Sequence, residues 1–364
     1  MSKLRVVIAD DSVIYRSQIR EALDAMAGVE VVAVASNGRL AADRLGQSAA
    51  DLLILDLEMP EMDGLQTLVE LKKRGLTCKV VVFSSASKRG AEITMEALKL
   101  GASDFIAKPG ADSAAGEAKP SGRIRELLEP RIRALFPLTE TPSPLTGSTA
   151  SALAPFPKLH WEIFQPRIIV IGSSTGGPSA LEHIFSQFSG PIRCPILITQ
   201  HMPPVFTAAL AERISKISGI PAAEAKHGAA IENNHIYIAP GDFHLRVQGT
   251  AERPFLTLDQ TPQIHSVRPA VDPLFVSASA LFQSRCLGIV LTGMGADGRV
   301  GAEAIKHHGG AVVIQNKASC VVFGMPGAVQ ASGAYDREAT PDEIAVLLAE
   351  KAGARAAPLQ KRAS

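Results

Sequence analysis

The sequence has little cysteine, and its cysteines are not paired by spacing. The chain has 364 residues, and its four cysteines are scattered with no CxxC motif: Cys78, Cys194, Cys286 and Cys320. Each lies in or beside an apolar run, which favours small core residues over metal ligands or disulfides. This cysteine usage fits a reducing compartment, and we predict a cytoplasmic protein.

The sequence also lacks an excess of charge of one sign and a long apolar run. Lys and Arg total 37 against 36 Asp and Glu, so the net charge of +1 gives no reason to expect nucleic-acid binding. No apolar run approaches the roughly 20 residues of a membrane span, and the N-terminus has no signal-peptide core, so we expect no membrane insertion. With 46% hydrophobic and 20% charged residues, the chain is globular rather than disordered.

Strand and helix patterns alternate along residues 3–136. The predicted strands are Arg5–Ala9, Val29–Ala35, Leu52–Leu55, Lys79–Phe83 and Asp104–Ala107. Helical patterns lie between them, and Arg123–Phe136 is predicted to close the domain after an insert at 110–122. Strict alternation predicts a doubly wound parallel sheet with right-handed crossovers.

The chain changes character after this domain. Residues 137–164 are rich in Pro, Ser, Thr and Ala without periodicity, which predicts a linker. A second alternating α/β block, a parallel-sheet domain, is predicted over residues 165–350, with hairpin-like strands near His235–Ala239, Leu245–Val247 and Pro254–Leu258. Thr340 and Glu343 form a capping box for its last helix, and residues 351–364 are predicted to be a frayed tail.

In the first domain, four of the five predicted strands are followed by polar side chains that could act together in one site. They are Asp10, Asp11, Asp56, Ser84 and Lys108. Carboxyl ends of parallel strands share one edge of a sheet, so three carboxylates should meet there, and Mg²⁺ is the natural cation to hold them. Asp56 is then a candidate nucleophile for a phosphoryl group, with Lys108 and Ser84 contacting its oxygens. The Lys108–Pro109 pair permits a cis peptide bond.

This first domain resembles the receiver domain of two-component response regulators, which has a flavodoxin-like fold. The resemblance is carried by Val7–Ser12, Leu55–Gly64 and Gly101–Pro109. It implies that Asp56 is the phosphoacceptor and that Asp10 and Asp11 help to hold Mg²⁺. It further implies that the backbone carbonyl of Glu58 is a metal ligand and that Phe105 is an aromatic switch residue.

In the second domain, three apolar runs each end at a residue that hydrolytic chemistry can use. Ser173 and Ser174 precede Thr175-Gly176-Gly177, His201 follows one strand, and Asp297 follows another. The glycine loop alone could bind a phosphate, but it lacks the Lys of a P-loop and the GxGxxG spacing. Three such residues at one sheet edge favour a nucleophile, a base and an orienting acid in the order Ser, His, Asp, which is not the α/β-hydrolase order.

The second domain resembles the chemotaxis protein-glutamate methylesterase domain. The motifs that carry the resemblance are Ile171–Pro178, Gln200–Pro204, Ile238–Gly241, Arg268–Asp272, Leu291–Gly298 and Val322–Pro326. It implies that Ser174 is the nucleophile, His201 the base, Asp297 the orienting acid and the Met294 N–H the oxyanion donor. Ser173 stands where Ala is usual, and Gln315–Lys317 is less acidic than the family pattern.

Together these resemblances imply a phosphorylation-activated protein-glutamate methylesterase and protein-glutamine deamidase. Its substrate would be the cytoplasmic helices of a methyl-accepting chemoreceptor, and a chemotaxis histidine kinase would be the phosphodonor. The resting receiver is expected to block the triad, and the esterase step needs no cofactor. We expect a monomer. The alternatives are a receiver fused to a non-catalytic module that binds a nucleotide or a partner, and an interaction protein that titrates a kinase.

Overall fold

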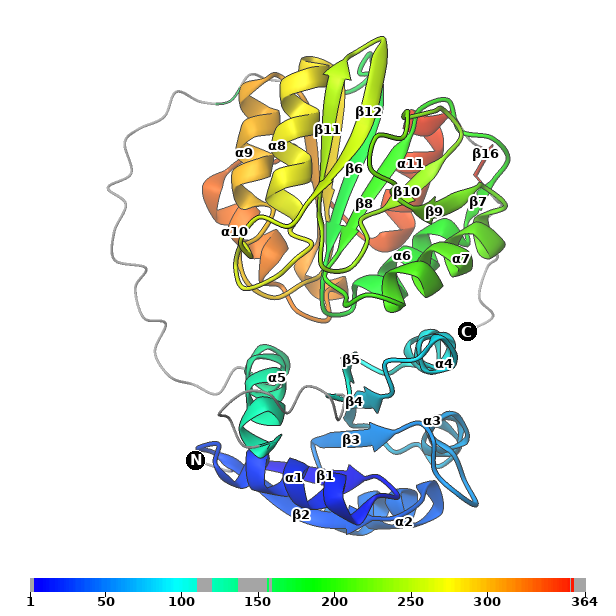
Figure 1. The fold of residues 1–364 in the computed structure, drawn as a ribbon, viewed down its shortest axis with the longest axis vertical. Coiled ribbons are helices and arrows are strands. Elements are labelled where there is room, and N and C mark those ends of the chain that lie inside the picture. Colours follow the sequence, from blue (N-terminus) through cyan, green and yellow to red (C-terminus); the bar gives the residue numbers. More distant parts are fainter. Residues whose placement is uncertain (1–2, 110–119, 137–155, 157–158, 354, 357–364) are drawn as a thin grey trace. The chain divides into compact units, whose positions relative to one another are not determined.

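The computed structural model describes residues 3–109, 120–136, 156, 159–353 and 355–356. The chain forms two compact units, Met1–Pro142 and Ser143–Ser364, each built around its own sheet (Figure 1). Most of the predicted insert and most of the predicted linker, 110–119, 137–155 and 157–158, lie outside the described residues. Among the described residues, no helix has both the length and the apolar character needed to cross a bilayer.

The first unit has a five-stranded parallel sheet in the order β2-β1-β3-β4-β5. Its strands are β1 (Leu4–Ala9), β2 (Val29–Ala35), β3 (Leu52–Asp56), β4 (Lys79–Ser84) and β5 (Asp104–Ala107). Its helices are α1 (Val13–Asp24), α2 (Gly38–Ser48), α3 (Gly64–Lys73), α4 (Lys88–Lys99) and α5 (Pro120–Leu135). The order confirms the doubly wound fold, and it reverses between β1 and β3, where such sheets bind ligands.

Local sequence explains where these elements begin. All five residues of β3 are buried, as expected for a central parallel strand covered on both faces. The Ser12 side chain accepts a hydrogen bond from the Tyr15 N–H and starts α1, which directs the chain away from the β1 end. Helix α5 begins at Pro120, three residues before the predicted start, because Pro is well suited to a first helical turn.

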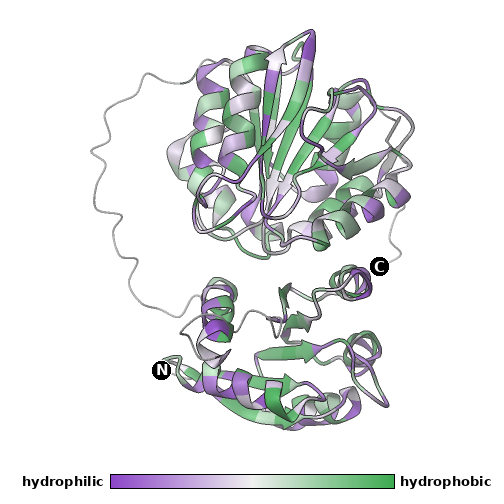
Figure 2. Ribbon diagram, viewed as in Figure 1, coloured by the Kyte–Doolittle hydropathy of each residue, from purple (hydrophilic) through white to green (hydrophobic). Residues whose placement is uncertain are grey.

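The second unit has a seven-stranded sheet in the order β15-β14-β13-β6-β8-β10-β9, parallel throughout. The strands are β6 (Ile168–Ser173), β8 (Ile196–Gln200), β9 (Ala222–Glu224), β10 (Ile236–Ile238), β13 (Cys286–Val290), β14 (Ala311–Gln315) and β15 (Arg337–Ala339). Strand β6 comes first in the chain and lies between β13 and β8, so this sheet reverses its order beside β6. Figure 2 shows these strands as mainly hydrophobic.

Helices cover both faces of this sheet. They are α6 (Gly177–Phe185), α7 (Phe206–Ser218), α8 (Val271–Phe282), α9 (Arg299–His307), α10 (Met325–Ser332) and α11 (Pro341–Ala352), with short 3₁₀ helices η2 (Gln283–Arg285) and η3 (Lys317–Ser319). A Cβ on Gly172 would lie 2.4 Å from Val271 of α8, and a Cβ on Gly177 of α6 would lie 2.7 Å from Ser173. Consecutive strand residues point to opposite faces, so α8 and α6 cover opposite faces.

Three predictions about the second unit need correction or qualification. Strand β10 is not part of a hairpin but pairs in parallel with β8 and β9, while β11 (His244–Thr250) and β12 (Arg253–Asp259) form the expected antiparallel hairpin. The expected frayed tail is partly ordered, since Arg355–Ala356 (β16) pairs with Phe188–Ser189 (β7). Near the end of the predicted linker, the Phe156 ring packs against His307 with centroids 5.0 Å apart.

Candidate functional sites

The first site lies at the carboxyl ends of β1, β3 and β5, where the sequence predicted it. Asp10 and Asp56 are buried, and Asp11 is exposed beside them. Lys108 Nζ lies 2.8 Å from Asp56 Oδ2 and 3.0 Å from Asp10 Oδ2. The Lys108–Pro109 peptide bond is trans. Among the described residues, the cis peptide bond is Arg268–Pro269. Lys108 thus joins two carboxylates that would otherwise repel each other.

The donor set at this site fits a hard divalent cation. One oxygen each from Asp10, Asp11 and Asp56 lies within 4.8 Å of the others. Asp10 Oδ2 is buried, and among the described residues Lys108 Nζ, 3.0 Å away, is its polar neighbour, so the oxygen lacks a full set of partners. The Glu58 N–H donates to Asp56 Oδ1 over 3.3 Å, and no hydrogen bond of the described residues uses the Glu58 carbonyl. Free carboxylate and carbonyl oxygens of this kind suit Mg²⁺.

Burial controls the charge of Asp56. Burial raises the pKa of Asp56 to about 6, although Lys108 lowers it through a hydrogen bond and through its charge, and the charge of Asp10 adds to the rise. A carboxylate must be ionised to act as a nucleophile. Any cation that binds here therefore also favours the reactive form of Asp56.

Two of the predicted support residues, Ser84 and Phe105, lie on β4, which pairs with the strand that ends at Asp56, and on β5, which pairs with β4. The Ser84 hydroxyl is buried and donates to the Gly90 carbonyl in the first turn of α4 over 3.2 Å. Phe105 is buried on β5. Sequence reasoning missed Arg16, which donates to the Asp10 and Asp11 carbonyls over 2.6 and 2.8 Å and holds the β1–α1 loop. The only available signal was an Arg one turn after the Asp pair.

The second site lies where the other sheet reverses its order. Ser173 of β6 pairs with Gln200 of β8, so Ser174 and His201 follow directly on adjacent strands. Ser173 is fully buried, and its hydroxyl donates to Gln200 Oε1 over 2.6 Å. Ser174 is half-buried, and its hydroxyl makes no hydrogen bond within the part of the chain that the structure describes. Of the two serines, Ser174 has the available hydroxyl.

Gln200 holds the serine and histidine segments together, and sequence reasoning did not assign it a role. Its amide nitrogen donates to the Ser174 carbonyl over 3.0 Å and to the His201 carbonyl over 3.3 Å. It is buried, with 2% of its surface exposed. A long polar side chain at the last position of an apolar strand was the only sign of this role.

Asp297 is a buried carboxylate with a full set of hydrogen-bond donors. His201 Nε2 lies 2.7 Å from Asp297 Oδ2, and the N–H groups of Val271, Asp272 and Gly298 donate to the same carboxylate over 2.6, 3.0 and 2.9 Å. Burial raises the pKa of Asp297, but the hydrogen bond and charge of His201 and the N–H groups outweigh it and lower the pKa. Asp297 therefore remains an acceptor, which requires the proton on His201 Nε2.

The remaining nitrogen of His201 is available for chemistry. His201 Nδ1 makes no hydrogen bond in the described part of the chain, and neither does the Ser174 hydroxyl. The structure thus shows the His201–Asp297 bond already formed and no hydrogen bond from His201 to Ser174. Serine–histidine contacts of this kind often form only when substrate is bound.

The loop after β13 packs against Ser174 at Gly293 and carries an unused N–H group at the next residue, Met294. The Met294 N–H donates to no acceptor among the described residues. A Cβ on Gly293 would lie only 2.8 Å from Ser174 Cβ, so this loop can approach the serine only with glycine there. Gln315 fixes the loop by accepting from the Thr292 N–H over 2.9 Å. The departure from an acidic pattern at Gln315 therefore leaves a supporting residue in place.

Comparisons with known proteins cover both units. Residues 6–117 match the response regulator receiver domain, and residues 169–348 match the family described as CheB methylesterase. The protein-glutamate methylesterase/protein-glutamine glutaminase of Trichodesmium erythraeum is 40% identical, over 97% of this chain and 100% of the relative. The protein-glutamate methylesterase/protein-glutamine glutaminase 2 of Caulobacter vibrioides is 39% identical, over 96% and 99%.

A solved structure agrees with these matches. The crystal structure of the Thermotoga maritima CheB methylesterase catalytic domain is 41% identical, with a TM-score of 0.50, and the match covers 51% of this chain and 98% of that one. The relatives match over nearly their whole length and over both units of this chain. The chain therefore belongs to the CheB methylesterase family, with a response regulator receiver domain ahead of the methylesterase domain.

Proposed function

We propose that this chain is a protein-glutamate methylesterase and protein-glutamine glutaminase whose rate is controlled by phosphorylation of Asp56. Its substrates are methyl-esterified glutamate and glutamine side chains on the cytoplasmic helices of a chemoreceptor, and a histidine kinase supplies the phosphoryl group. The names of the relatives support the activity, and the receiver match supports the regulation. The observation that carries the proposal is the grouping of Ser174, His201 and Asp297 at one sheet edge.

Ester hydrolysis proceeds in two steps at Ser174. His201 Nδ1 takes the Ser174 proton while Ser174 Oγ attacks the ester carbonyl, and the Met294 N–H stabilises the resulting oxyanion. The proton passes to the departing methoxide, which leaves as methanol. Water then loses a proton to His201 and attacks the glutamyl-serine ester, and His201 returns the proton to Ser174 Oγ as the ester bond breaks and the glutamate leaves. With glutamine as substrate, ammonia leaves in place of methanol.

The hydrogen bonds of Asp297 support this use of His201. Asp297 already accepts from three backbone N–H groups and is held ionised. It therefore fixes the ring so that Nδ1 is the basic nitrogen, and its charge stabilises the ring when Nδ1 takes a proton.

In the receiver, Asp56 attacks the phosphoryl group carried by the kinase. Asp10, Asp11, Asp56 and the Glu58 carbonyl would hold Mg²⁺, which neutralises phosphoryl charge when bound. Lys108, 2.8 Å from Asp56, offers a fixed positive charge to a phosphoryl oxygen. In this proposal the resting receiver keeps hydrolysis slow, and phosphorylated Asp56 relieves it through Ser84 and Phe105.

Methanol release from a methylated chemoreceptor fragment tests the proposed activity. The full-length chain should release methanol, and Ser174→Ala should not, even when the variant is folded. Equal release by the two proteins would show that the hydrolytic centre lies elsewhere. No release by the wild-type chain, with phosphodonor and Mg²⁺ present, would contradict the activity itself.

A further inference from the structure

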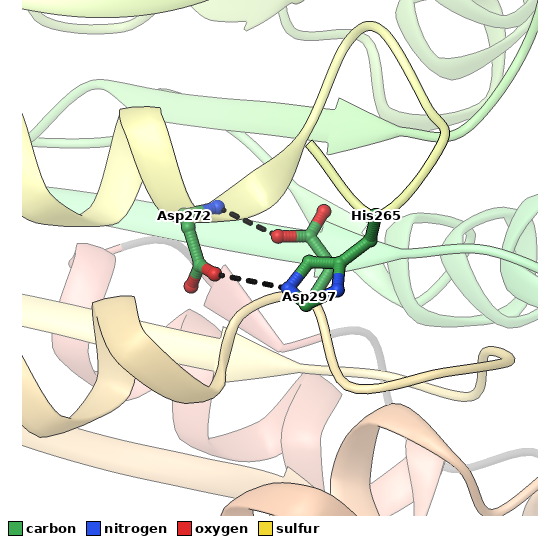
Figure 3. Close-up of side chains that lie close together, drawn as sticks. All are labelled: His265, Asp272 and Asp297. Carbon is green, nitrogen blue, oxygen red and sulfur yellow. Dashed lines mark hydrogen bonds and ion pairs between the residues drawn. The ribbon is translucent and has the colours of Figure 1, made fainter. Parts of the chain in front are cut away.

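A second buried carboxylate lies beside Asp297. Asp272 is the second residue of α8, and 7% of its surface is exposed. Its N–H donates to Asp297 Oδ1 over 3.0 Å (Figure 3). Its own Oδ1 accepts from the Gly301 N–H over 2.7 Å in the first turn of α9. Asp272 thus links the start of α8 to the start of α9, and Asp297 is held between these two helix starts.

An imidazole lies beside both carboxylates, because one His265 ring nitrogen and one oxygen each of Asp272 and Asp297 lie within 4.8 Å of one another. His265 Nε2 is 3.7 Å from Asp272 Oδ2, and the His265 side chain is partly exposed (Figure 3). His265 and Ser266 have φ angles of 52° and 62° and form the middle of a turn in which Ile264 and Val267 exchange hydrogen bonds. Two successive non-glycine residues with positive φ are unfavourable, and such strain gathers at functional sites.

The loop that carries His265 is firmly held. Arg268 donates to the carbonyls of Gln260 and Thr261 over 3.0 and 2.9 Å, and its guanidinium pairs with Asp242 Oδ1 at 2.6 Å. These bonds fix both ends of the turn, so the position of His265 over Asp272 is set by the fold.

The charge of Asp272 depends on its neighbours. Burial raises the pKa of Asp272 to about 6, the charge of Asp297 adds to the rise, and the Gly301 N–H and His265 lower it. The other titratable or charged groups on the elements around it have partners of their own. On β11, the buried His244 bonds to the Pro262 carbonyl and the Ala270 N–H. On α9, Arg299 pairs with Glu303.

We propose that Asp272 is a positioning residue for the His201–Asp297 pair and that its negative charge, supported by His265, stabilises protonated His201 during hydrolysis. The proposal rests on the proposed ester hydrolysis. Asp272 acts through Asp297 and touches no reacting atom. When His201 takes the serine proton, it becomes a cation next to one carboxylate with a second one behind it, and both carboxylates favour that charge.

The first test replaces the charge while keeping an acceptor oxygen. Asp272→Asn can still accept from the Gly301 N–H, so we expect a folded protein in which kcat/KM falls about tenfold, equivalent to roughly 1.4 kcal/mol. Two assays are run on the full-length chain, with methylated receptor and with p-nitrophenyl acetate, and each is compared with Ser174→Ala.

The pH profile separates an electrostatic role from a merely structural one. If Asp272 must be ionised and His201 neutral, log kcat/KM should approach a slope of two on the acid side in the wild-type chain. In Asp272→Asn the slope should approach one. Should this variant fail to fold, His265→Asn carries the test.

The charge of His265, when the ring is protonated, favours ionised Asp272 and disfavours protonated His201, and His265→Asn removes it. The loss of both effects moves the acid limb of kcat/KM to higher pH, and the shift should shrink in the Asp272→Asn background. His183→Asn is the matched control, because His183 is also a partly exposed imidazole beside a carboxylate, 2.6 Å from Asp342, and should leave the profile unchanged.

The outcomes are distinct. A folded Asp272→Asn with wild-type rate and slope, or a His265→Asn profile identical to wild type, overturns the role of Asp272 alone. Hydrolysis of p-nitrophenyl acetate through Ser174 without release of methanol from receptor overturns the proposed substrate, while the Asp272 result stands. Absence of hydrolysis in both assays overturns both proposals.

Discussion

Ser173 and Ser174 are adjacent residues with different surroundings. Ser173 is buried and bonded to Gln200, whereas the half-buried Ser174 has a free hydroxyl within the described part of the chain. We expect Ser173→Ala to retain most of its hydrolytic rate but to lose about 1–3 kcal/mol of stability, because Gln200 Oε1 loses its donor. Ser174→Ala should lose several orders of magnitude in rate with little change in stability.

Methanol release and urea unfolding of the two variants check this prediction. A collapse of the rate in Ser173→Ala with a normal unfolding curve would mean that the nucleophile has been assigned to the wrong serine.

An Asn side chain cannot replace the carboxylate of Asp297. An Asn at this position can present an N–H group to His201 Nε2, so the proton moves to Nδ1 and the base is lost. We expect Asp297→Asn to lower kcat by roughly 10³- to 10⁴-fold while far-ultraviolet circular dichroism remains unchanged. Asp342→Asn, at the exposed His183–Asp342 pair, is the control and should hydrolyse normally. Near wild-type activity in Asp297→Asn would remove Asp297 from the mechanism.

Asp56 should make the folded protein less stable as the pH rises. Its pKa is raised from 3.8 to about 6 by burial, so the folded state binds more protons than the unfolded state between these values. Stability from this group is complete below about pH 4 and is lost as the pH rises through about 6. Asp56→Asn should therefore gain up to about 3 kcal/mol at pH 7 without Mg²⁺.

Urea unfolding of the full-length chain at pH 4 and pH 7 measures this gain. Asp43→Asn, an exposed carboxylate paired with Arg74, should change stability by less than about 1 kcal/mol. An equal gain for Asp56→Asn at both pH values would show that burial of charge is not its source.

At the scale of elements, capping chemistry is where sequence and structure agree most directly. The Glu343 N–H donates to Thr340 Oγ1 over 3.2 Å, and Glu343 Oε2 accepts from the Thr340 N–H over 2.7 Å at the start of α11. Thr340→Ala should cost about 1 kcal/mol in the unfolding of this unit and leave hydrolysis unchanged. Ser186→Ala, which removes an exposed hydroxyl that caps no N–H group among the described residues, should cost less. Equal costs would argue against the cap.

The elements that sequence predicted best are those whose apolar runs end at a polar residue. In a parallel sheet such ends meet, so the sequence alone placed Asp10 and Asp56, and likewise Ser174 and His201, at common edges. Strand β10 was misassigned because its short apolar run near a hairpin gives no sign of which partner it pairs with. Gln200, Asp272 and Arg16 could not be assigned roles, because their hydrogen bonds depend on how distant segments pack.

At the scale of the whole molecule, the chain combines a response regulator receiver domain with a methylesterase domain. In the receiver domain, Lys108 lies within 3.0 Å of the buried carboxylates of Asp10 and Asp56. In the second unit, the His201–Asp297 hydrogen bond is already formed. In the proposed regulation, phosphorylation of Asp56 acts on hydrolysis through the receiver's own packing, for which Ser84 and Phe105 are the candidates. We expect coupling of typical size, a roughly 5- to 150-fold change.

Methanol release by the full-length chain, with and without a small-molecule phosphodonor and Mg²⁺, tests the central claim most directly. The wild-type chain should release methanol slowly at rest and roughly tenfold faster or more with the phosphodonor. Asp56→Asn should stay at the resting rate, and Ser174→Ala should release none under either condition. Acceleration of Asp56→Asn by the phosphodonor, or release by Ser174→Ala, would contradict the account.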